Sequence, residues 1–273
     1  MPNPTFPVRR SFHLWKAFLI LAAIAVTACW LLLTPAGVLN KLNAIGYAVC
    51  HQISERSFAM GSGYMPLCIR CTGVFTAALI TLAFLFLRGR RNSLPRPLIL
   101  ALMGCLILFF ILDGTNSYLG FFPGVPTLYA PTTFLRLASG SGFGMVLGSL
   151  LAFIFHNTVW KTAPPLPLLS GWKDFGRLVL LIAGVDAVLL SGIGWVRIPL
   201  GVLSALTVPV ILTLVYTLLA LFVFNKDNQI DAWTELMFPV LGGWAVTLLQ
   251  IGLITWIRFS LTGTWAGFPA TIY

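Results

Sequence analysis

The sequence has little charge: 9% of its 273 residues are Asp, Glu, Lys or Arg, and only 7 are acidic. Soluble globular domains carry about 25% charged residues, because their surface faces water. With 58% hydrophobic residues, the composition excludes an ordinary soluble fold. The net charge of +10 does not indicate nucleic-acid binding, because the basic residues form small groups between apolar runs instead of one stripe.

Several motifs of well-known enzyme classes are also absent from the sequence. It has no phosphate-cradling glycine-rich loop, no H-E-x-x-H pair of zinc proteases and no G-x-S-x-G nucleophile turn. Nor do two related halves with interrupted apolar segments appear, a pattern found in many transporters. The sequence therefore gives no support to these classes.

The apolar runs have membrane-spanning length, since a hydrocarbon core of about 30 Å requires roughly 20 helical residues. The sequence predicts an all-α, polytopic transmembrane helical bundle of about seven spans, at residues 17–33, 72–87, 97–112, 138–159, 178–195, 198–224 and 236–257. The first run follows basic residues, as in a secretory signal. We interpret it as a retained span, because its apolar run is long and no A-x-A site follows.

The distribution of Lys and Arg predicts a cytoplasmic N-terminus, in the plasma (inner) membrane of the cell. This orientation puts the larger basic group inside: Arg9, Arg10, Lys16, Arg88, Arg90, Arg91, Arg96, Lys161, Lys173, Arg177 and Lys226. The smaller group lies outside: Lys41, Arg56, Arg70, Arg136, Arg197 and Arg258. With seven spans, the C-terminus is extracytoplasmic.

The segments between the spans suggest how the chain is organised. Residues 36–49 carry apolar side chains at helical spacing and predict a short interfacial helix. The Pro-rich stretch 161–177 resembles a cytoplasmic linker, which divides a four-span part, 1–160, from a three-span part, 178–273. Gly140, Gly144 and Gly148 recur every four residues and predict close helix contact, within the chain or with another membrane subunit.

Cysteine gathers in one stretch, CHQISERSFAMGSGYMPLCIRCTG at residues 50–73. Cys68 and Cys71 have the C-x2-C spacing that lets two thiolates chelate one metal, and Cys50 with His51 adds soft ligands upstream. Three Cys and one His would complete a tetrahedral zinc site at the extracytoplasmic boundary of the membrane. Adjacent residues point in different directions, so one of Cys50 and His51 would ligate while the other bonds to the backbone or packs.

Two other interpretations of the cysteines stay open. Extracytoplasmic cysteines commonly form disulfides, and free Cys is also a small buried hydrophobe, which is our interpretation of Cys29 and Cys105. Alternatively, the helix N-terminus and Arg70 would lower the pKa of the Cys68 and Cys71 thiols. That would suit a thiol oxidoreductase acting on a quinone or another lipid-soluble substrate.

The motif CHQISERSF…PLCIRCTG, followed by LDG and then by LRLASG, resembles a family of bacterial and archaeal integral membrane proteins described only as a domain of unknown function. The resemblance covers about residues 45–150. Its motif positions here are Cys50, His51, Arg56, Ser57, Pro66, Cys68, Arg70, Cys71, Gly73, Asp113, Gly114 and Arg136. Many members carry a Gln soon after Asp-Gly, where this chain reads DGTNS. The resemblance implies a common site and transfers no activity.

Five charged residues are further candidates for a polar site. Asp113 and Arg136 flank the third and fourth spans on the side of the cysteines, where they would pair or contact a polar ligand. Asp113 could also orient His51, as carboxylates do for metal-bound imidazole. Arg56 and Arg70 could compensate thiolate charge, bind lipid phosphate or extend toward water. Asp186 lies near the midplane of its span.

Asp186 has two interpretations. The first is a proton relay or a contact with a substrate, and the second is an interhelical bond, for which Gln250 is a plausible partner.

Taken together, the sequence predicts an integral membrane protein in a lipid bilayer with a structural zinc site. It leaves open whether the protein acts alone or as an accessory subunit of a membrane assembly. The alternative is the thiol oxidoreductase.

Overall fold

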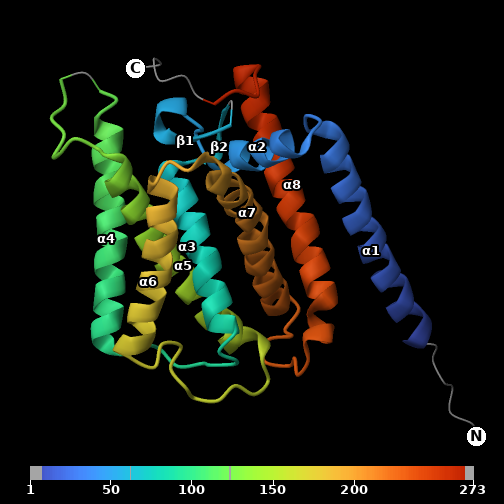
Figure 1. Ribbon diagram of the computed structural model, residues 1–273. Helices are drawn as coiled ribbons and strands as arrows, with labels where there is room; N and C mark the ends of the chain where they lie inside the picture. The colour runs from blue at the N-terminus through green and yellow to red at the C-terminus, as the bar shows by residue number, and fades with distance from the viewer. Residues whose placement is uncertain (1–7, 62, 123, 268–273) are drawn as a thin grey trace, which may run out of the picture.

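The computed structural model describes residues 8–61, 63–122 and 124–267 and consists mainly of helices that run side by side (Figure 1). In chain order the α-helices are α1 (Val8–Leu33), α2 (Val38–Val49), α3 (Ile69–Phe86), α4 (Pro97–Leu119), α5 (Thr133–Val159), α6 (Trp172–Leu190), α7 (Gly194–Val223) and α8 (Met237–Thr262). Two short 3-10 helices, η1 (Ser54–Arg56) and η2 (Trp233–Leu236), and two strands, β1 (Ser57–Met60) and β2 (Gly63–Cys68), complete the fold. The all-α, polytopic prediction is confirmed.

Among the described residues, 6 helices are long and apolar enough to cross a membrane, namely α1, α3, α4, α5, α7 and the continuous segment of η2 and α8. They correspond to all predicted spans but one. The span predicted at 178–195 corresponds to α6, which packs against α3, α5 and α7 but is not among the six. Its first turns carry Lys173, Asp174 and Arg177, which lower its hydropathy.

The bundle has two ends with different contents (Figure 1). At one end lie α2, the two strands and the loop 120–132, and we call this the hairpin end. At the other end lie the connections 87–96, 160–171 and 224–232, and we call this the connector end. The first helix begins at the level of the connector end, and α8 finishes at the hairpin end (Figure 1).

The hairpin of β1 and β2 was not predicted from the sequence. The strands pair antiparallel with Ser57 opposite Cys68, and Gly61 at the turn has a φ of 62°. A positive φ is easily adopted by glycine, which explains a glycine in this turn. The hairpin carries the chain from the end of α2 to the start of α3.

The end of the third predicted span also differs from the sequence prediction. The sequence predicts a span at 97–112. The helix α4 continues beyond it to Leu119, and residues 120–122 and 124–132 are irregular. Asp113 and Asn116 consequently lie on a helix and face the bundle, where both are buried.

Close contact between α3 and α5 depends on the predicted glycine stripe. A Cβ added at Gly140 would fall on the carbonyl oxygen of Arg70, and one at Gly144 would fall on that of Val74. At Gly148 the nearest atom would be the carbonyl oxygen of Ala78, at 2.8 Å. The stripe therefore serves packing inside this chain, and it is not available as the contact surface for another subunit.

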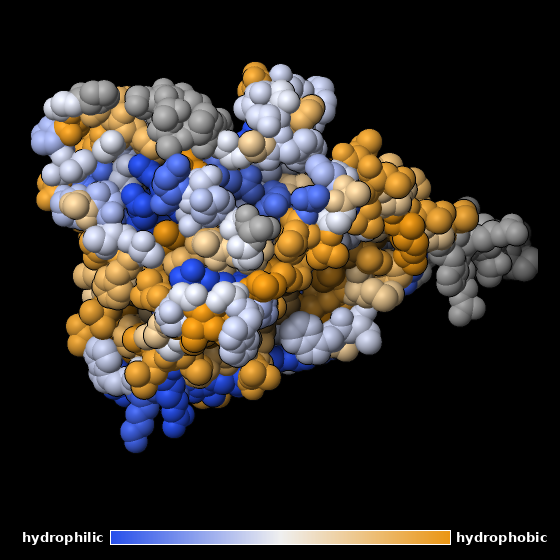
Figure 2. Space-filling view, turned by 45° about the horizontal axis from the view of Figure 1, so that its top comes forward, coloured by the Kyte–Doolittle hydropathy of each residue, from blue (hydrophilic) through white to orange (hydrophobic). Residues whose placement is uncertain are grey.

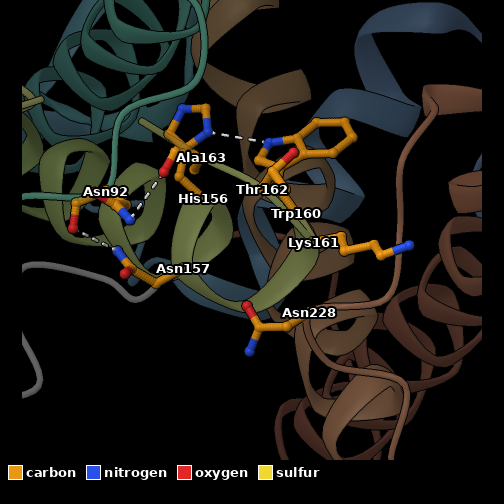
Figure 3. A pocket seen from close by; sticks show the side chains of 8 residues that line it. All are labelled: Asn92, His156, Asn157, Trp160, Lys161, Thr162, Ala163 and Asn228. Carbon is orange, nitrogen blue, oxygen red and sulfur yellow. Dashed lines mark hydrogen bonds between the residues drawn. The ribbon is translucent and has the colours of Figure 1, made fainter. Parts of the chain in front are cut away.

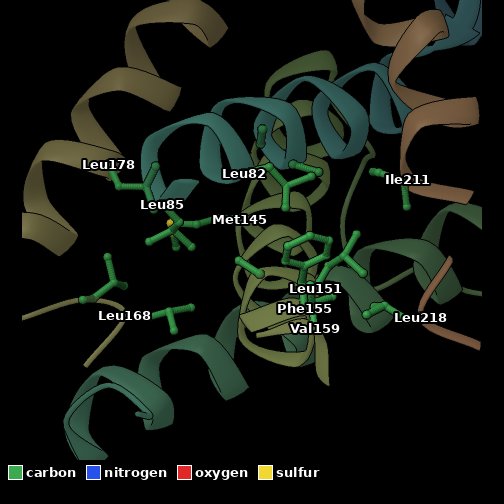
Figure 4. Close-up of a cluster of buried hydrophobic side chains, with 14 of the residues drawn as sticks. Leu82, Leu85, Met145, Leu151, Phe155, Val159, Leu168, Leu178, Ile211 and Leu218 are labelled. Carbon is green, nitrogen blue, oxygen red and sulfur yellow. The ribbon is translucent and has the colours of Figure 1, made fainter. Parts of the chain in front are cut away.

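The largest apolar core lies where α3, α5, α6 and α7 meet near the connector end (Figure 4). It contains Phe155 and Val159 of α5 together with Leu85 of α3 and Leu178 of α6. Each of these side chains is at most 1% exposed. Between helices in a bilayer such a core is stabilised by close van der Waals packing, and this one joins four helices.

Apolar side chains also cover much of the outer surface of the molecule (Figure 2). In α1 only 6% of the spanning window is buried, and in α4 only 17%. Such surfaces suit a lipid bilayer, and the protein is a multi-pass membrane protein. Cys29 on α1 and Cys105 on α4 are exposed on these surfaces. Our interpretation of them as buried was wrong, because both helices lie at the periphery.

Candidate metal centre

The structure brings three of the four predicted ligands together. The Sγ atoms of Cys50, Cys68 and Cys71 all lie within 4.8 Å of one another. Cys50 directly follows α2, Cys68 ends β2, and Cys71 is in the first turn of α3. Three thiols at this separation could hold one metal ion, since zinc–sulfur bonds of about 2.3 Å place tetrahedral ligands roughly 3.8 Å apart.

Backbone contacts hold the first cysteine against the other two. A Cβ at Gly46 of α2 would overlap the carbonyl oxygen of Pro66, so glycine allows α2 to approach the hairpin closely. Gln52 donates from its Nε2 to the carbonyl oxygens of Asn43, at 3.0 Å, and Pro66, at 2.8 Å. The side chain of Gln52 therefore clamps the segment around Cys50 to the hairpin.

The Cys50 sulfur is surrounded by hydrogen-bond donors. It accepts from the backbone N–H of Cys68, at 3.2 Å, and from that of Gln52, at 3.4 Å. Hydrogen bonds from the Cys68 and Cys71 thiols, and from His51, hold the pKa of Cys50 well below its ordinary value despite its burial. Donation to Cys50 raises the pKa of Cys68 to about 12. The cluster thus favours one thiolate, at Cys50.

His51, the fourth predicted ligand, is not in the group of three sulfurs. Its ring contacts the Cys50 thiol, and its Nδ1 accepts from the backbone N–H of Ile53 at 3.3 Å. The side chain is partly exposed. The imidazole is therefore beside the cluster, and a change of its rotamer would be needed for it to complete a four-ligand site.

The last helix contributes a residue that the sequence reasoning missed. Arg258 of α8 donates through Nη1 to the carbonyl oxygens of Tyr47 and Cys50, both at 2.6 Å, and through Nη2 to that of His51 at 3.3 Å. Its guanidinium also stacks on the Tyr47 ring, 3.8 Å from the centroid. Arg258 thus fixes the backbone at the end of α2 from outside the motif.

Asp113 is the centre of a second polar cluster, beside the cysteines. Its carboxylate is fully buried and accepts from Arg70 of α3, through Nε at 2.9 Å and through Nη2. The hydroxyls of Tyr129 and Ser139 also donate to it, both at 2.9 Å. Neither Arg136 nor His51 bonds to Asp113. The expected pairing with Arg136 and the proposed orientation of His51 are both incorrect.

Tyr129 and Asn116 were not predicted as members of this cluster. The Asn116 side chain is 1% exposed; its Nδ2 donates to the carbonyl oxygen of Tyr129 at 2.9 Å, and its Oδ1 accepts from the Leu128 N–H at 2.7 Å. This amide holds the loop so that Tyr129 reaches Asp113. Burial, followed by the hydrogen bond to Asp113, raises the pKa of Tyr129 to about 12, so the phenol remains a donor.

Arg56 and Arg136 complete the polar surroundings. Arg56 stacks on Phe121, 3.8 Å from the ring centroid, and its Nη1 lies 3.5 Å from the carbonyl oxygen of Ser117. Desolvation, followed by repulsion from Arg136 and Arg70, lowers the pKa of Arg56. All three guanidinium groups are therefore near one another at the hairpin end.

Asp186 lies away from both clusters. It accepts from the Ser141 hydroxyl at 2.8 Å, which joins α6 to α5. Gln250, its expected partner, instead accepts from the Tyr216 hydroxyl at 2.7 Å. The predicted pair is wrong, because α7 pairs with α8 here and supplies Gln250 with a nearer donor. The hydrogen bond from Ser141 to Asp186 is nevertheless an interhelical bond, which is one of the two interpretations of Asp186 from the sequence.

A polar cavity of about 340 Å³ opens at the connector end, lined by Asn92, His156, Asn157, Trp160, Lys161, Thr162, Ala163 and Asn228 (Figure 3). His156 is 2% exposed, and its Nδ1 accepts from the Trp160 indole N–H at 3.1 Å. Asn92 and Asn157 bind backbone carbonyl oxygens of the connections. These contacts fasten loops to α5, and we assign the cavity no chemistry.

Comparisons with known proteins support the resemblance drawn from the motif. A family described as "Predicted membrane protein (DUF2085)" matches residues 50–150, which contain both clusters. An uncharacterised protein of the archaeon Methanothermobacter thermautotrophicus is 27% identical over 108 residues, covering 40% of this chain and 88% of its own length. No solved structure matches. Residues 50–150 thus resemble an uncharacterised family of membrane proteins, as their motif predicted.

Proposed function

We propose that this protein is a plasma-membrane protein that binds one zinc ion through Cys50, Cys68 and Cys71, and that the ion has a structural role. The observation that carries the proposal is the convergence of three sulfurs within 4.8 Å at the hairpin end. Thiolates are the ligands that zinc favours in structural sites. The fourth ligand is His51 after a change of rotamer, or water.

The structural role follows from where the ligands lie in the fold. They come from the end of α2, from β2 and from α3, so one ion would tie a short surface helix and a two-stranded hairpin to the bundle. An isolated two-stranded hairpin is marginally stable at best. Metal binding supplies folding free energy to such small units.

The thiol oxidoreductase is the weaker alternative. It would use Cys68 and Cys71, and its nucleophile would need to be a thiolate. In this cluster the thiolate is favoured at Cys50, whereas the Cys68 thiol is disfavoured as an anion. Three sulfurs within 4.8 Å of one another suit shared ligation of one cation, whereas a dithiol of Cys68 and Cys71 would leave Cys50 without a role.

The membrane orientation is also a proposal. The Lys and Arg distribution favours a cytoplasmic connector end, which puts the hairpin end and the metal centre outside the cytoplasm. Cysteines introduced singly into the connections 87–96 and 120–132, in a chain that lacks Cys29 and Cys105, can be tested with an impermeant thiol reagent in intact cells. Labelling of 120–132 alone is expected, and labelling of 87–96 alone would reverse the orientation.

Metal content tests the central proposal. Purified protein should contain about one zinc per chain, and Cys68→Ser should lose the metal and unfold at lower temperature. Cys105→Ser is the matched control, because Cys105 lies on the outer surface of α4 and its loss should change neither quantity. His51→Gln should weaken zinc retention if His51 is the fourth ligand and leave it unchanged if water is.

Thiol labelling before and after a reductant separates the two functions. A reversible bridge between Cys68 and Cys71, found together with the absence of metal, would replace the structural zinc site by the redox alternative. Protein that contains neither metal nor a bridge would leave the cysteines a role in packing only. An accessory role in a membrane assembly is tested separately, by crosslinking in native membranes followed by mass spectrometry.

A further inference from the structure

Three arginine side chains lie near one another at the hairpin end, with one buried carboxylate, Asp113, among them. Arg56 comes from η1, Arg70 from the first turn of α3 and Arg136 from the first turn of α5. Each of Arg56 and Arg136 is repelled electrostatically by Arg70, and Arg56 also by Arg136. The exposed Glu55, next to Arg56, is a second carboxylate that attracts it, so positive charge remains in excess in this group.

Asp113 cannot neutralise this excess, because its oxygens are already used. They accept from Arg70, Tyr129 and Ser139, and the carboxylate is fully buried. Arg70 is bound to it and also donates to the Ser117 hydroxyl at 2.8 Å. The positive charges of Arg56 and Arg136 therefore remain without a counter-charge at hydrogen-bonding distance in the described part of the chain.

Arg136 shows that an acceptor is required at this position. Its Nε is buried and has no hydrogen-bond partner among the described residues, and neither of its Nη groups makes a hydrogen bond to them. A buried donor without an acceptor costs about 1–3 kcal/mol, and more when it is charged. A bound ion or water is one way in which such a buried donor gains its acceptor.

Extension toward water does not explain this arrangement. Arg56 lies flat on the Phe121 ring, and Arg136 turns its Nε into the protein instead of outward. Long basic side chains that merely snorkel keep their charged ends in water. Arg56 is held by its contact with Phe121, and Arg70 by Asp113 and Ser117. Fixed donors of this kind are the preorganisation that a binding site requires.

We propose that Arg56, Arg70 and Arg136 bind a phosphate group, supplied by a phospholipid headgroup or by free phosphate. Planar guanidinium groups present paired donors that match the oxygens of phosphate, and Arg is the residue most used for this recognition. The excess of positive charge suits an anion. At the hairpin end, the site lies where headgroups of the bilayer would be found.

The first experiment uses the full chain, delipidated in an uncharged detergent, in its metal-loaded and metal-free forms. Inorganic phosphate should raise the unfolding temperature, compared with sodium chloride at matched ionic strength. Arg136→Gln and Arg56→Gln should each weaken phosphate binding roughly tenfold, since a hydrogen bond to a charged group contributes about 1.5–3 kcal/mol. Arg197→Gln is the matched control: Arg197 is at the same end, donates to Leu189 and stacks on Phe58.

The second experiment distinguishes the two sources of phosphate. Native mass spectrometry of protein released from nanodiscs of phosphatidylcholine with phosphatidylglycerol should show retained phosphatidylglycerol in the control variant and less in Arg136→Gln. Retained lipid identifies a headgroup site, and stabilisation by inorganic phosphate without retained lipid identifies a free-phosphate site. Neither effect, or effects of equal size in Arg136→Gln and Arg197→Gln, would overturn the proposal. Unchanged elution of each variant in size-exclusion chromatography excludes misfolding as the cause.

Discussion

The two ends of the bundle use their charged residues differently. At the hairpin end, Asp113 is fully buried and its partners are side chains from α3, α5 and the loop 120–132. At the connector end, the ion pair of Lys161 and Asp231 is 3.5 Å long, and both side chains are more than half exposed. Buried charges are costly unless fully paired. The hairpin end therefore contains the specific polar site, and the connector end mainly joins helices.

The largest difference between the ends should appear on removing one carboxylate at each. Asp113→Asn leaves the partly buried Arg70 without its counter-charge and should cost about 3–5 kcal/mol of unfolding free energy. Asp231→Asn removes an exposed pair and should cost at most about 1 kcal/mol. Thermal unfolding of both variants in the same detergent measures the difference. Equal losses would mean that the two ends do not differ as described.

A smaller effect is expected from the glycine stripe that supports the hairpin end. Gly140→Ala places a Cβ against the carbonyl oxygen of Arg70 and should destabilise the protein by about 1–3 kcal/mol. Gly104→Ala on α4 is the matched control, because no atom lies within 4 Å of its added Cβ. The control should be neutral or slightly stabilising, since alanine favours a helix. A neutral Gly140→Ala would show that α3 and α5 can separate easily.

Local opening of the metal centre tests the contribution of α8. In metal-free protein, Arg258→Lys replaces a fork that binds three carbonyl oxygens by a single ammonium group. Cys50 should then react roughly tenfold faster with a thiol reagent, because one or more charge-assisted hydrogen bonds are lost. Arg197→Lys should leave the rate unchanged. An unchanged rate in Arg258→Lys would contradict a role for α8 in holding Cys50.

A modest effect should come from the shorter and more buried ion pair of the connector end. Asp174 lies 2.7 Å from Arg88 and accepts from the Ser170 N–H at 2.9 Å. Asp174→Asn should lower the unfolding free energy by about 1 kcal/mol, the value of a helix cap and a partly exposed pair. Zinc content should not change. A loss of zinc in this variant would show that the two ends are coupled.

The helices and the meeting of the cysteines could be predicted from the sequence, because both depend on local signals. Apolar runs of spanning length identify transmembrane helices, and the C-x2-C spacing with Cys50 nearby indicates one cluster. The hairpin was missed, although two apolar segments flank Gly61 and Gly63. Its strands have 4 and 6 residues, which is too short to form an apolar run of spanning length.

The partners of the charged residues could not be predicted, because they depend on how the helices are rotated and offset. Asp113 was expected beside Arg136 or His51, and it pairs with Arg70. Nothing in one sequence states which residue of α3 lies level with which residue of α4. The same limit explains why Gln250 was assigned to Asp186 and why the Tyr129 hydroxyl was overlooked.

The contact of Gly140 with the carbonyl oxygen of Arg70 has a consequence for the whole hairpin end. It joins two main chains directly, so the distance between the starts of α3 and α5 does not depend on the size or rotamer of any side chain between them. Arg70 and Arg136 inherit this fixed separation, as does the Cys68–Cys71 pair relative to Ser139. Lipid-facing positions of both helices can accept apolar side chains of different size while the dimensions of the polar region stay the same.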